Sequence, residues 1–489
     1  MTIAPGAEPQ TTLNPYVGPR AFRPRETLYG RDREKRELTD LLIAQRIVLL
    51  HAPSGAGKTS LIQAGVTPRL RDEGFSPTPA LRVKTRAPNN RSVTNPYVYS
   101  VAYYLLGNDR STRELARMKF EDIIAAAAER TPDETPVLVL DQFEDILILD
   151  PSDRKNQREF FRDLGEALDK TGAWALFSIR EDFMGGLERY ARYVPGHLAA
   201  RFRLDYLEHE AALPAIQRPA RDHGVDFPDG AARRLVERLA TTKVQRPGGR
   251  EDQVATPYVQ PFQLQVVCRS LWRTVRKQHE AEGKPFKSIK LRDVDGADIE
   301  GAMRNYYRGV VQAVAKKTTA DEGDIRDWFQ RELITSQRYR RQTITGPSSR
   351  DVDPAVVARE LERLYLVRSD SRTESTWYEL SHDRLIDAVI ADNEAWRLPR
   401  LAPWRVAARK WLKTKDPDQL LRGWDLEAAR RADQTKLLDG EREFIRESEQ
   451  AEHRGVIGRM QRSLGMTYRL VIFEFVVIIV LAVLLFLNG

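Results

Sequence analysis

The most informative segment of the chain is residues 47–62, Ile47-Val-Leu-Leu-His-Ala-Pro-Ser-Gly-Ala-Gly-Lys-Thr-Ser-Leu-Ile62. An apolar strand leads into a turn of small residues, and an amphipathic helix follows. The backbone N–H groups of such a turn converge on one point, which the positive N-terminal end of the helix also faces. The stretch therefore predicts a phosphate-binding loop in an α/β core.

The loop is suited to a nucleoside triphosphate. Lys58 would reach the β- and γ-phosphates, and the Thr59 hydroxyl would hold Mg²⁺. The strict pattern begins with Gly, whereas this chain has Ala52, a difference of one methyl group that we expect the turn to tolerate. A glycine turn that only joins a strand to a helix is the alternative. The residues expected to contact nucleotide are Pro53, Ser54, Gly55, Ala56, Gly57, Lys58, Thr59 and Ser60.

The amino-acid composition limits the classes of protein to which the chain can belong. The 489 residues are 41% hydrophobic and 30% charged, which indicates a folded chain of about three domains. The net charge of +8 is the excess of 78 Lys and Arg over 70 Asp and Glu, so nucleic-acid binding is permitted but not implied. The single cysteine, Cys268, excludes an internal disulfide and a cysteine-rich zinc site. Residues 1–10 lack the features of a secretory signal, so we expect the bulk of the protein in the cytoplasm.

A second motif, Thr135-Pro-Val-Leu-Val-Leu-Asp-Gln-Phe-Glu-Asp145, predicts a buried parallel strand with an acidic carboxyl end. Asp141 is placed to order Mg²⁺ beside the phosphate loop, unless it ends the strand only by chance. Gln142 follows where many motor NTPases carry Glu. Glutamine orients water without accepting its proton, which predicts slow hydrolysis unless Glu144 or Asp145 is the base. The motif therefore favours a switch over a fast motor.

Two further segments flank this core. The expected strand Ala173–Ile179 ends at Arg180, which would sense the γ-phosphate or pair with Glu181 or Asp182 instead. Ahead of the loop, the turn Gly30-Arg31 would close over a bound base or only cap the next helix. The other core elements expected are a short strand over Ala80–Thr85 and helices over Tyr97–Leu106 and Phe120–Arg130.

The order of these motifs resembles the bacterial novel STAND branch of signal-transduction ATPases. The motifs are Asn14-Pro-Tyr with Tyr29-Gly-Arg, Pro-Ser-Gly-Ala-Gly-Lys-Thr, Leu-Asp-Gln-Phe-Glu, Arg180-Glu-Asp-Phe and Pro261-Phe-Gln-Leu. The resemblance implies a P-loop core, a helical lid and a winged-helix domain that together hold ADP in a resting monomer. ATP exchange, triggered by a sensed partner, would then allow homo-oligomerisation. The resemblance also places Pro261 against the base, although proline at a helix start is ordinary.

The lid and winged-helix regions follow the core. The lid is expected to hold helices over Arg203–Ala220, Ala231–Ala240 and Phe262–Val275, with a mobile loop over Thr241–Pro257. The next expected helices, Gly296–Ala315, Asp324–Thr335 and Pro354–Leu364, precede a hairpin of Leu366–Arg368 and Trp377–Leu380. Helices followed by such a hairpin predict a winged helix. Its expected recognition helix has no basic excess, because Arg359 and Arg363 accompany Glu360 and Glu362, which disfavours DNA binding.

His382 directly follows the wing. In related switch ATPases a histidine at this place contacts the β-phosphate of ADP and holds the closed state, and the resemblance implies that role for His382. A histidine that caps the next helix or packs on the wing is the alternative.

The C-terminal part is basic and then apolar. Residues 396–463 contain 16 Lys and Arg against 11 Asp and Glu, with Trp404, Trp411 and Trp424 as expected packing anchors. This segment is attracted to anionic lipid headgroups, or else is a solvated helical face. Leu470–Leu487 carries one charge, Glu474, and at ~1.5 Å per residue spans about 27 Å. We expect a single membrane-spanning helix there.

We therefore expect an α/β P-loop NTPase core, a helical lid, a winged helix, a helical stalk and one C-terminal transmembrane helix. The expected domains are 1–24 (N-terminal extension), 25–204 (core), 205–286 (lid), 287–395 (winged helix), 396–463 (basic juxtamembrane region) and 464–489 (membrane tail). The expected function is a slow ATPase that acts as an ATP/ADP-dependent switch, with Mg²⁺ as cofactor, in bacterial signalling or in antiphage or stress defence at the inner membrane. The alternative is a membrane-tethered, winged-helix regulator of DNA.

Overall fold

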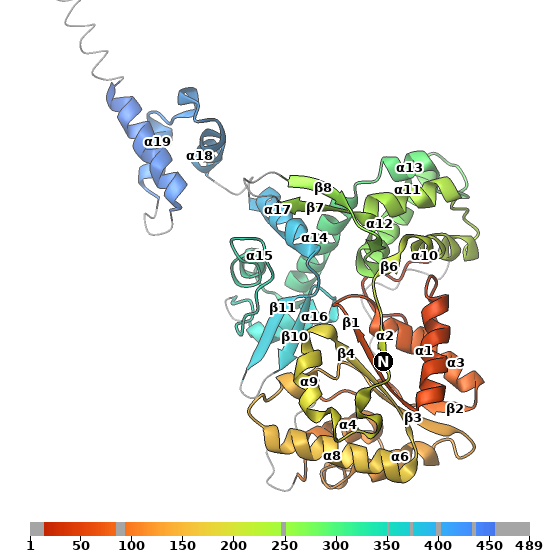
Figure 1. Cartoon of the computed structure of the whole chain (residues 1–489). Helices are drawn as coiled ribbons and strands as arrows, with labels where there is room; N and C mark the ends of the chain where they lie inside the picture. The colour runs from red at the N-terminus through yellow and green to blue at the C-terminus, as the bar shows by residue number, and fades with distance from the viewer. Residues whose placement is uncertain are drawn as a thin grey trace, which may run out of the picture. The chain divides into compact units, whose positions relative to one another are not determined.

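The structure is a computed structural model that describes residues 14–84, 93–245, 251–349, 352–371, 375–397, 402–432 and 437–454. The chain divides into two compact units, residues 1–392 and 393–489. The first unit contains an α/β core and the segments expected to form the lid and the winged helix, and these two names are kept for the segments below (Figure 1).

Five parallel strands form the core sheet, in the order β2-β3-β4-β1-β5. Their bounds are Ile47–Ala52 for β1, Phe75–Pro77 for β2, Thr135–Leu140 for β3, Trp174–Arg180 for β4 and Arg201–Arg203 for β5. Strand β4 lies between β1, which leads into the phosphate loop, and β3, which ends just before Asp141. The carboxyl ends of these three strands therefore bring the loop, Arg180 and Asp141 to one edge of the sheet.

Helices cover both faces of this sheet (Figure 1). Ile47 and Leu49 of β1 belong to the core beneath one set of helices, whereas Val48 and Leu50 belong to the core on the opposite face. The first set includes α4 (Pro96–Leu106), α6 (Phe120–Glu129), α8 (Arg154–Thr171) and α9 (Met184–Ala191). The second includes α1 (Asp32–Gln45), α2 (Lys58–Leu61) and α3 (Thr67–Asp72), with a π-helical turn over Ile62–Val66. Burial on both faces explains the continuous apolar runs of the central strands.

The edge of the sheet differs from the prediction. The strand expected over Ala80–Thr85 is reduced to a single bridge between Leu81 and Leu140, and Thr85 lies outside the described residues. The edge strand is β2 instead. Proline lacks the N–H that a ladder requires, so Pro77 and Pro79 limit this edge to a short strand followed by isolated bonds.

The lid contains α10 (His209–Asp222), α11 (Asp229–Ala240), α12 (Pro261–Ala281) and α13 (Leu291–Asp295). The helix expected from Arg203 begins six residues later, because Arg201–Arg203 forms β5 and Leu207–Glu208 (β6) pairs with Tyr258–Val259 (β9). The prediction of a mobile loop over Thr241–Pro257 was also wrong. This segment contains an antiparallel hairpin of β7 (Thr241–Gln245) and β8 (Glu251–Ala255), whose threonines and valines favour strands.

The N-terminal segment is fastened to the lid. Tyr16 is fully buried in the lid core, and its hydroxyl donates to the carbonyl of Ile216 at 2.6 Å. The Asn14 side chain donates to the carbonyl of Arg269 at 2.9 Å, and the Arg269 side chain donates to the carbonyl of Tyr16 at 3.0 Å. The segment expected as an extension is therefore, from Asn14 onward, a structural part of the lid.

The winged helix has the expected elements. Helices α14 (Ile299–Thr318), α15 (Glu322–Glu332) and α16 (Pro354–Arg363) precede the antiparallel hairpin of β10 (Val367–Ser371) and β11 (Thr376–Leu380). Helix α17 (Leu385–Arg397) follows. The buried Arg326 forms an ion pair with the buried Asp392 at 2.8 Å. The carboxylate of Asp392 also accepts a hydrogen bond from Arg308. This charge-paired centre fixes α14, α15 and α17 against one another.

The second unit contains α18 (Pro403–Thr414), α19 (Trp424–Arg430) and a helix over residues 439–454. Trp404 and Trp411 are buried anchors as predicted, but Trp424 is 87% exposed, so that prediction was wrong. In the part of the chain that the structure describes, no helix has the length and apolar character needed to cross a membrane. The predicted helix Leu470–Leu487 lies outside that part.

Candidate nucleotide site

The phosphate loop connects β1 to α2. Gly55 and Gly57 have φ values of +81° and +100°, which L side chains rarely adopt, so the loop needs glycine at both positions. Ala52, which replaces the usual first glycine, is the last residue of β1 and is fully buried. The strand accommodates its methyl group, as expected.

The expected magnesium ligands lie together. The Thr59 hydroxyl donates to Oδ2 of Asp141 at 2.8 Å. Oδ1 of Asp141 is buried and has no hydrogen-bond partner among the described residues. No group of three or more His, Cys, Asp and Glu in the described ranges forms a metal site by itself. One hydroxyl and one carboxylate fit an Mg²⁺ ion that takes its other ligands from nucleotide phosphates and water.

Lys58 and Glu144 form the buried charged centre of the site. Burial lowers the pKa of Lys58, and the nearby carboxylates of Glu144 and Asp141 oppose this shift. Burial raises the pKa of Glu144, and Lys58 opposes that shift. Glu144 also accepts a bond from the backbone N–H of Arg180, at 3.2 Å. Glu144 is thus held at the edge of the sheet beside the lysine, where a water-activating base is needed.

Gln142 has a different role in the backbone. It has a φ of +53°, in the left-handed region, and forms the turn between β3 and Glu144. Its carbonyl accepts from the N–H of Asp145 at 3.0 Å. A non-glycine residue in this conformation is unusual and marks a backbone that the surroundings hold in place.

Arg180 forms the alternative pair foreseen from the sequence and a second pair that was not foreseen. Its Nη2 atom lies 2.5 Å from Asp182, and its Nη1 atom lies 3.7 Å from Glu379 of the wing. The guanidinium is largely buried at the carboxyl end of β4. It therefore joins the core to the winged helix.

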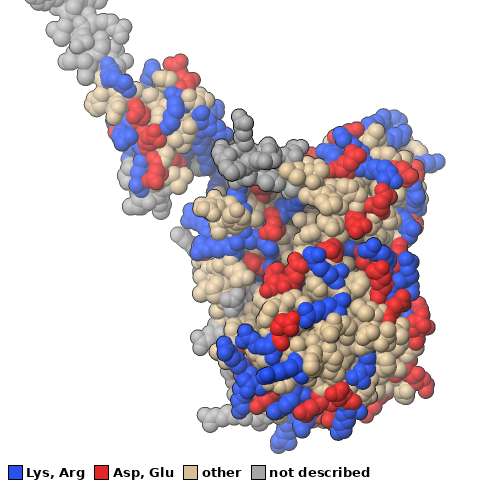
Figure 2. All heavy atoms as spheres, in the orientation of Figure 1, with Lys and Arg blue, Asp and Glu red and all other residues tan. Residues whose placement is uncertain are grey.

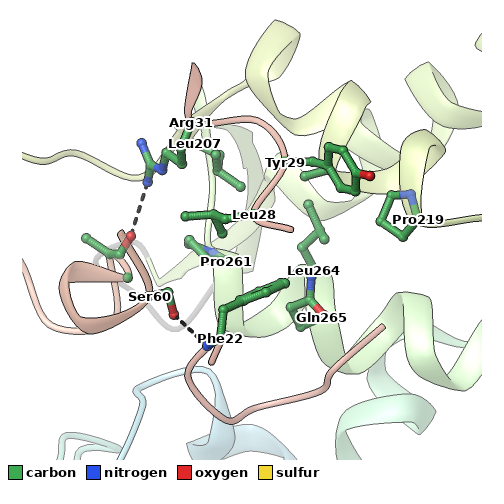
Figure 3. A pocket seen from close by; sticks show the side chains of 13 residues that line it. Phe22, Leu28, Tyr29, Arg31, Ser60, Leu207, Pro219, Pro261, Leu264 and Gln265 are labelled. Carbon is green, nitrogen blue, oxygen red and sulfur yellow. Dashed lines mark hydrogen bonds between the residues drawn. The ribbon is translucent and has the colours of Figure 1, made fainter. Parts of the chain in front are cut away.

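A pocket lies beside the loop, and its lining includes Arg31 and Pro261, two residues expected to contact the base (Figure 3). Its walls come from the N-terminal segment, the phosphate loop and the lid, and they are mostly apolar. Lining residues include Phe22, Leu28, Tyr29, Arg31, Gly57, Ser60, Pro261 and Leu264. The backbone N–H of Phe22 donates to the Ser60 hydroxyl at 3.2 Å, which connects the N-terminal segment to the loop. An apolar cleft that ends at a phosphate loop suits a nucleotide base.

The Gly30-Arg31 turn closes one side of this pocket. A Cβ atom at Gly30 would lie 2.2 Å from the carbonyl oxygen of Ala211, so only glycine allows α10 to approach so closely. Arg31 is buried and donates to the carbonyls of Ala56 and Asp205, at 3.1 and 2.6 Å. The turn thus holds the phosphate loop and the start of the lid in one arrangement.

The winged helix covers the other side of the loop. A Cβ atom at Gly55 would lie 2.6 Å from Cε1 of His382, so the imidazole touches the loop backbone. The His382 ring stacks on Phe262 of α12, with centroids 3.8 Å apart. Burial lowers the pKa of His382 to about 3, and Arg368 and Arg340 add to that shift. Arg368 of β10 donates to the Ser54 hydroxyl at 2.8 Å.

Several residues of this site were not predicted from the sequence. Arg368 donates to Ser54, and Glu379 forms an ion pair with Arg180. Phe262 stacks on His382, and Phe22 lines the pocket. One signal was available for Glu379, because it lies in the strand that ends just before His382, three residues ahead of that histidine. Nothing local marked the others, since domain packing brings them to the loop from distant parts of the chain.

The chain is similar to solved structures of low sequence identity. The Walker-type ATPase paby2304 of Pyrococcus abyssi is 12% identical, with a TM-score of 0.40 over 76% of this chain and 98% of that one. The Aeropyrum pernix ORC2 protein, in its ADPNP–ADP complexes, is 15% identical, with a TM-score of 0.36 over 76% and 96%. No curated protein matches the chain. The model of the novel STAND NTPase 1 family matches residues 15–417, so the chain belongs to this family of P-loop NTPases.

Proposed function

We propose that this STAND NTPase is an ATP/ADP-dependent switch whose winged helix closes over the phosphate loop. The observation that carries the proposal is the contact of His382 with Gly55, supported by the bond from Arg368 to Ser54. The loop that would bind phosphates is thereby also a docking surface for the winged helix. A nucleotide that fits one arrangement better than the other shifts the balance between closed and open forms.

ADP is the proposed ligand of the closed form. The base would lie in the pocket between Tyr29 and Pro261, and its phosphates would meet Lys58 and the loop N–H groups. Thr59 and Asp141 would hold Mg²⁺, which neutralises phosphate charge. Exchange for ATP would open the winged helix and expose surfaces for oligomerisation. Gln142 cannot accept a proton from water, so hydrolysis would be slow unless Glu144 or Asp145 acts as the base.

Nucleotide release tests this switch directly. Protein purified without added nucleotide should retain ADP, which chromatography of the denatured sample would detect. His382→Gln should release ADP faster and increase the oligomeric fraction with ATP. His223→Gln is the matched control, because His223 is exposed on the lid, where its ring contacts the carbonyl of Pro219 at 3.0 Å and lies edge-on to Trp272. Equal ADP release from both variants and from the wild type would refute the proposal.

We also propose a membrane-anchored role in bacterial signalling or antiphage and stress defence. The support is the sequence of the tail, in which basic residues precede the apolar segment Leu470–Leu487. A basic flank on that side would place the NTPase in the cytoplasm and Gly489 outside. A tag after Gly489 should be cleaved by protease added to intact cells. Protection until lysis would reverse the proposed topology, and activity after deletion of residues 470–489 would remove the effector role.

DNA regulation is the less supported function. In helix α16, Glu360 pairs with Lys317 and Arg363, and Glu362 pairs with Lys84 of the core at 3.0 Å. The expected recognition helix is thus partly engaged within the protein and has no excess of positive charge. Figure 2 likewise shows Lys and Arg interspersed with Asp and Glu over the face that it draws. Salt-dependent retention of the protein on duplex DNA would restore this alternative.

A further inference from the structure

The wing presents one buried carboxylate to the nucleotide site. Glu379 of β11 is 7% exposed and forms ion pairs with Arg368, its cross-strand partner on β10, and with Arg180 of the core. Gln342 donates to its second oxygen at 3.2 Å. The closed arrangement therefore fixes a negative charge between two arginines of different domains.

Both arginines belong to the surroundings of the phosphate loop. Arg368 donates to Ser54 within the loop. Arg180 on β4 lies opposite Ala52, the last residue of β1 before the loop begins. Both cations contribute to lowering the pKa of Lys58, after the larger effect of burial. Lys58 meets the β- and γ-phosphates in loops of this type. The guanidiniums that hold Glu379 are therefore close to the place where a terminal phosphate would bind.

We infer that Glu379 competes with the γ-phosphate for Arg180 and Arg368, and so makes the closed state selective for a nucleoside diphosphate. The inference rests on the proposed switch and names the residue that sets its nucleotide preference. Guanidinium groups bind carboxylates and phosphates in the same forked geometry, so the two anions are rivals for one set of donors. A diphosphate leaves both arginines to Glu379, whereas a triphosphate brings a second anion next to it.

The same competition explains how nucleotide identity reaches the winged helix. Glu379 lies near the carboxyl end of β11, and His382 lies two residues beyond that end, with only Leu380 and Ser381 between them. Ser381 is held by its N–H bond to the carbonyl of Leu366, at 3.0 Å, so this segment belongs to the wing as a body. Displacement of Glu379 would withdraw His382 from Gly55 as well. Glu379 acts as a positioning residue and takes no part in bond making.

The test is the ratio of two affinities in the full-length chain. Isothermal titration with ADP and with adenosine 5′-(β,γ-imido)triphosphate, both with Mg²⁺, gives this ratio without hydrolysis. The wild type should prefer ADP. Glu379→Gln should reduce the preference about tenfold, mainly through tighter binding of the triphosphate analogue. A purely structural role for Glu379 would weaken both ligands together and leave the ratio unchanged.

Two variants isolate the charge. Glu379→Asp keeps a carboxylate and should retain the preference for ADP. Glu362→Gln removes a carboxylate that joins the same two domains through Lys84, and it should leave the ratio at the wild-type value. An unchanged ratio in Glu379→Gln, or an equal fall in either of these variants, would overturn the inference.

Different experimental results would refute the role of Glu379 and the proposed switch. If His382→Gln speeds ADP release while Glu379→Gln keeps the wild-type ratio, the switch stands and the role of Glu379 is refuted. If the wild-type chain binds neither nucleotide, both are refuted. A melting temperature of Glu379→Gln close to that of the wild type would show that the measured ratio belongs to the folded protein.

Discussion

His382 of the winged helix touches Gly55 of the phosphate loop so closely that a Cβ atom on the glycine would lie 2.6 Å from the ring. Gly55 therefore meets two demands at once. Its φ of +81° requires a residue without a side chain, and the closed winged helix fills the space where a side chain would project. The loop conformation and the closed state depend on the same residue.

Gly55→Ala should open the winged helix as well as strain the loop. The backbone strain alone costs about 1–2 kcal/mol, and the contact with His382 adds to it. Gly74→Ala is the matched control, since Gly74 has a φ of +82° and no neighbouring atom within 4 Å of a Cβ. Both variants should lose thermal stability, but only Gly55→Ala should accelerate ADP release.

A double-mutant cycle separates the two costs. In Gly55→Ala combined with His382→Ala, the steric contact is gone and only the strain remains, so the effects on stability should not add. Strictly additive changes in unfolding free energy would show that the two residues do not contact each other in solution.

The sequence predicted the elements whose signal is local. The Gly-Lys-Thr run follows an apolar strand, the apolar run before Asp141 is a second strand, and Pro261 begins a helix, as expected. The meeting of Thr59 and Asp141 could also be foreseen, because parallel strands place their carboxyl ends at one edge. These features follow from neighbouring residues and from the rules of α/β sheets.

The missed features depend on tertiary packing. Nothing near Arg368 shows that it reaches Ser54, 314 residues away, and nothing near Tyr16 shows that it is buried against α10. The prediction of a loop over Thr241–Pro257 was wrong because this segment is rich in glycine and charged residues and shows no alternation of apolar and polar residues. The segment nevertheless forms the hairpin Thr241–Ala255. Trp424 was expected inside only because tryptophan is often buried, yet burial depends on what packs against it.

Lys58→Ala should abolish the stabilisation of the protein by nucleotide. Lys58 is the loop cation that would balance the β- and γ-phosphates, and the backbone N–H groups alone leave most of that charge uncompensated. At a ligand concentration of about 100 Kd, the wild type should gain roughly 2.7 kcal/mol of stability, seen as a rise in melting temperature. Lys155→Ala, which removes an exposed lysine on α8 of the same core, should keep this rise. A full rise in Lys58→Ala would contradict the assignment of the loop.

Asp141→Asn should impair hydrolysis more than nucleotide binding. The amide is nearly isosteric and still accepts from Thr59, but it lacks the charge that orders Mg²⁺. ADP affinity in the presence of EDTA should therefore match the wild type, whereas Mg²⁺-dependent phosphate release should fall about tenfold or more. An equal loss of affinity without Mg²⁺ would mark Asp141 as structural.

Acid should open the winged helix of the nucleotide-free protein through His382. The pKa of this residue is about 3 in the closed structure and about 6.5 for an imidazole in water. The open state therefore binds more protons below pH 6.5, so closure is favoured at higher pH and lost as pH falls. Between pH 7.5 and 5.5 the equilibrium should shift toward the open form about tenfold, and further acidification should continue the shift.

Fluorescence transfer between the core and the winged helix would report this opening. The single native cysteine, Cys268, is buried, so labels can be directed to cysteines introduced at the exposed positions Lys155 on α8 and Arg359 on α16. His382→Gln removes the titrating group but keeps a polar side chain, so most of the pH dependence should disappear in that variant. The remaining six histidines stay in place and provide the internal control. If both proteins open equally on acidification, another group controls the response, and His382 would not be the residue that senses protons at the phosphate loop.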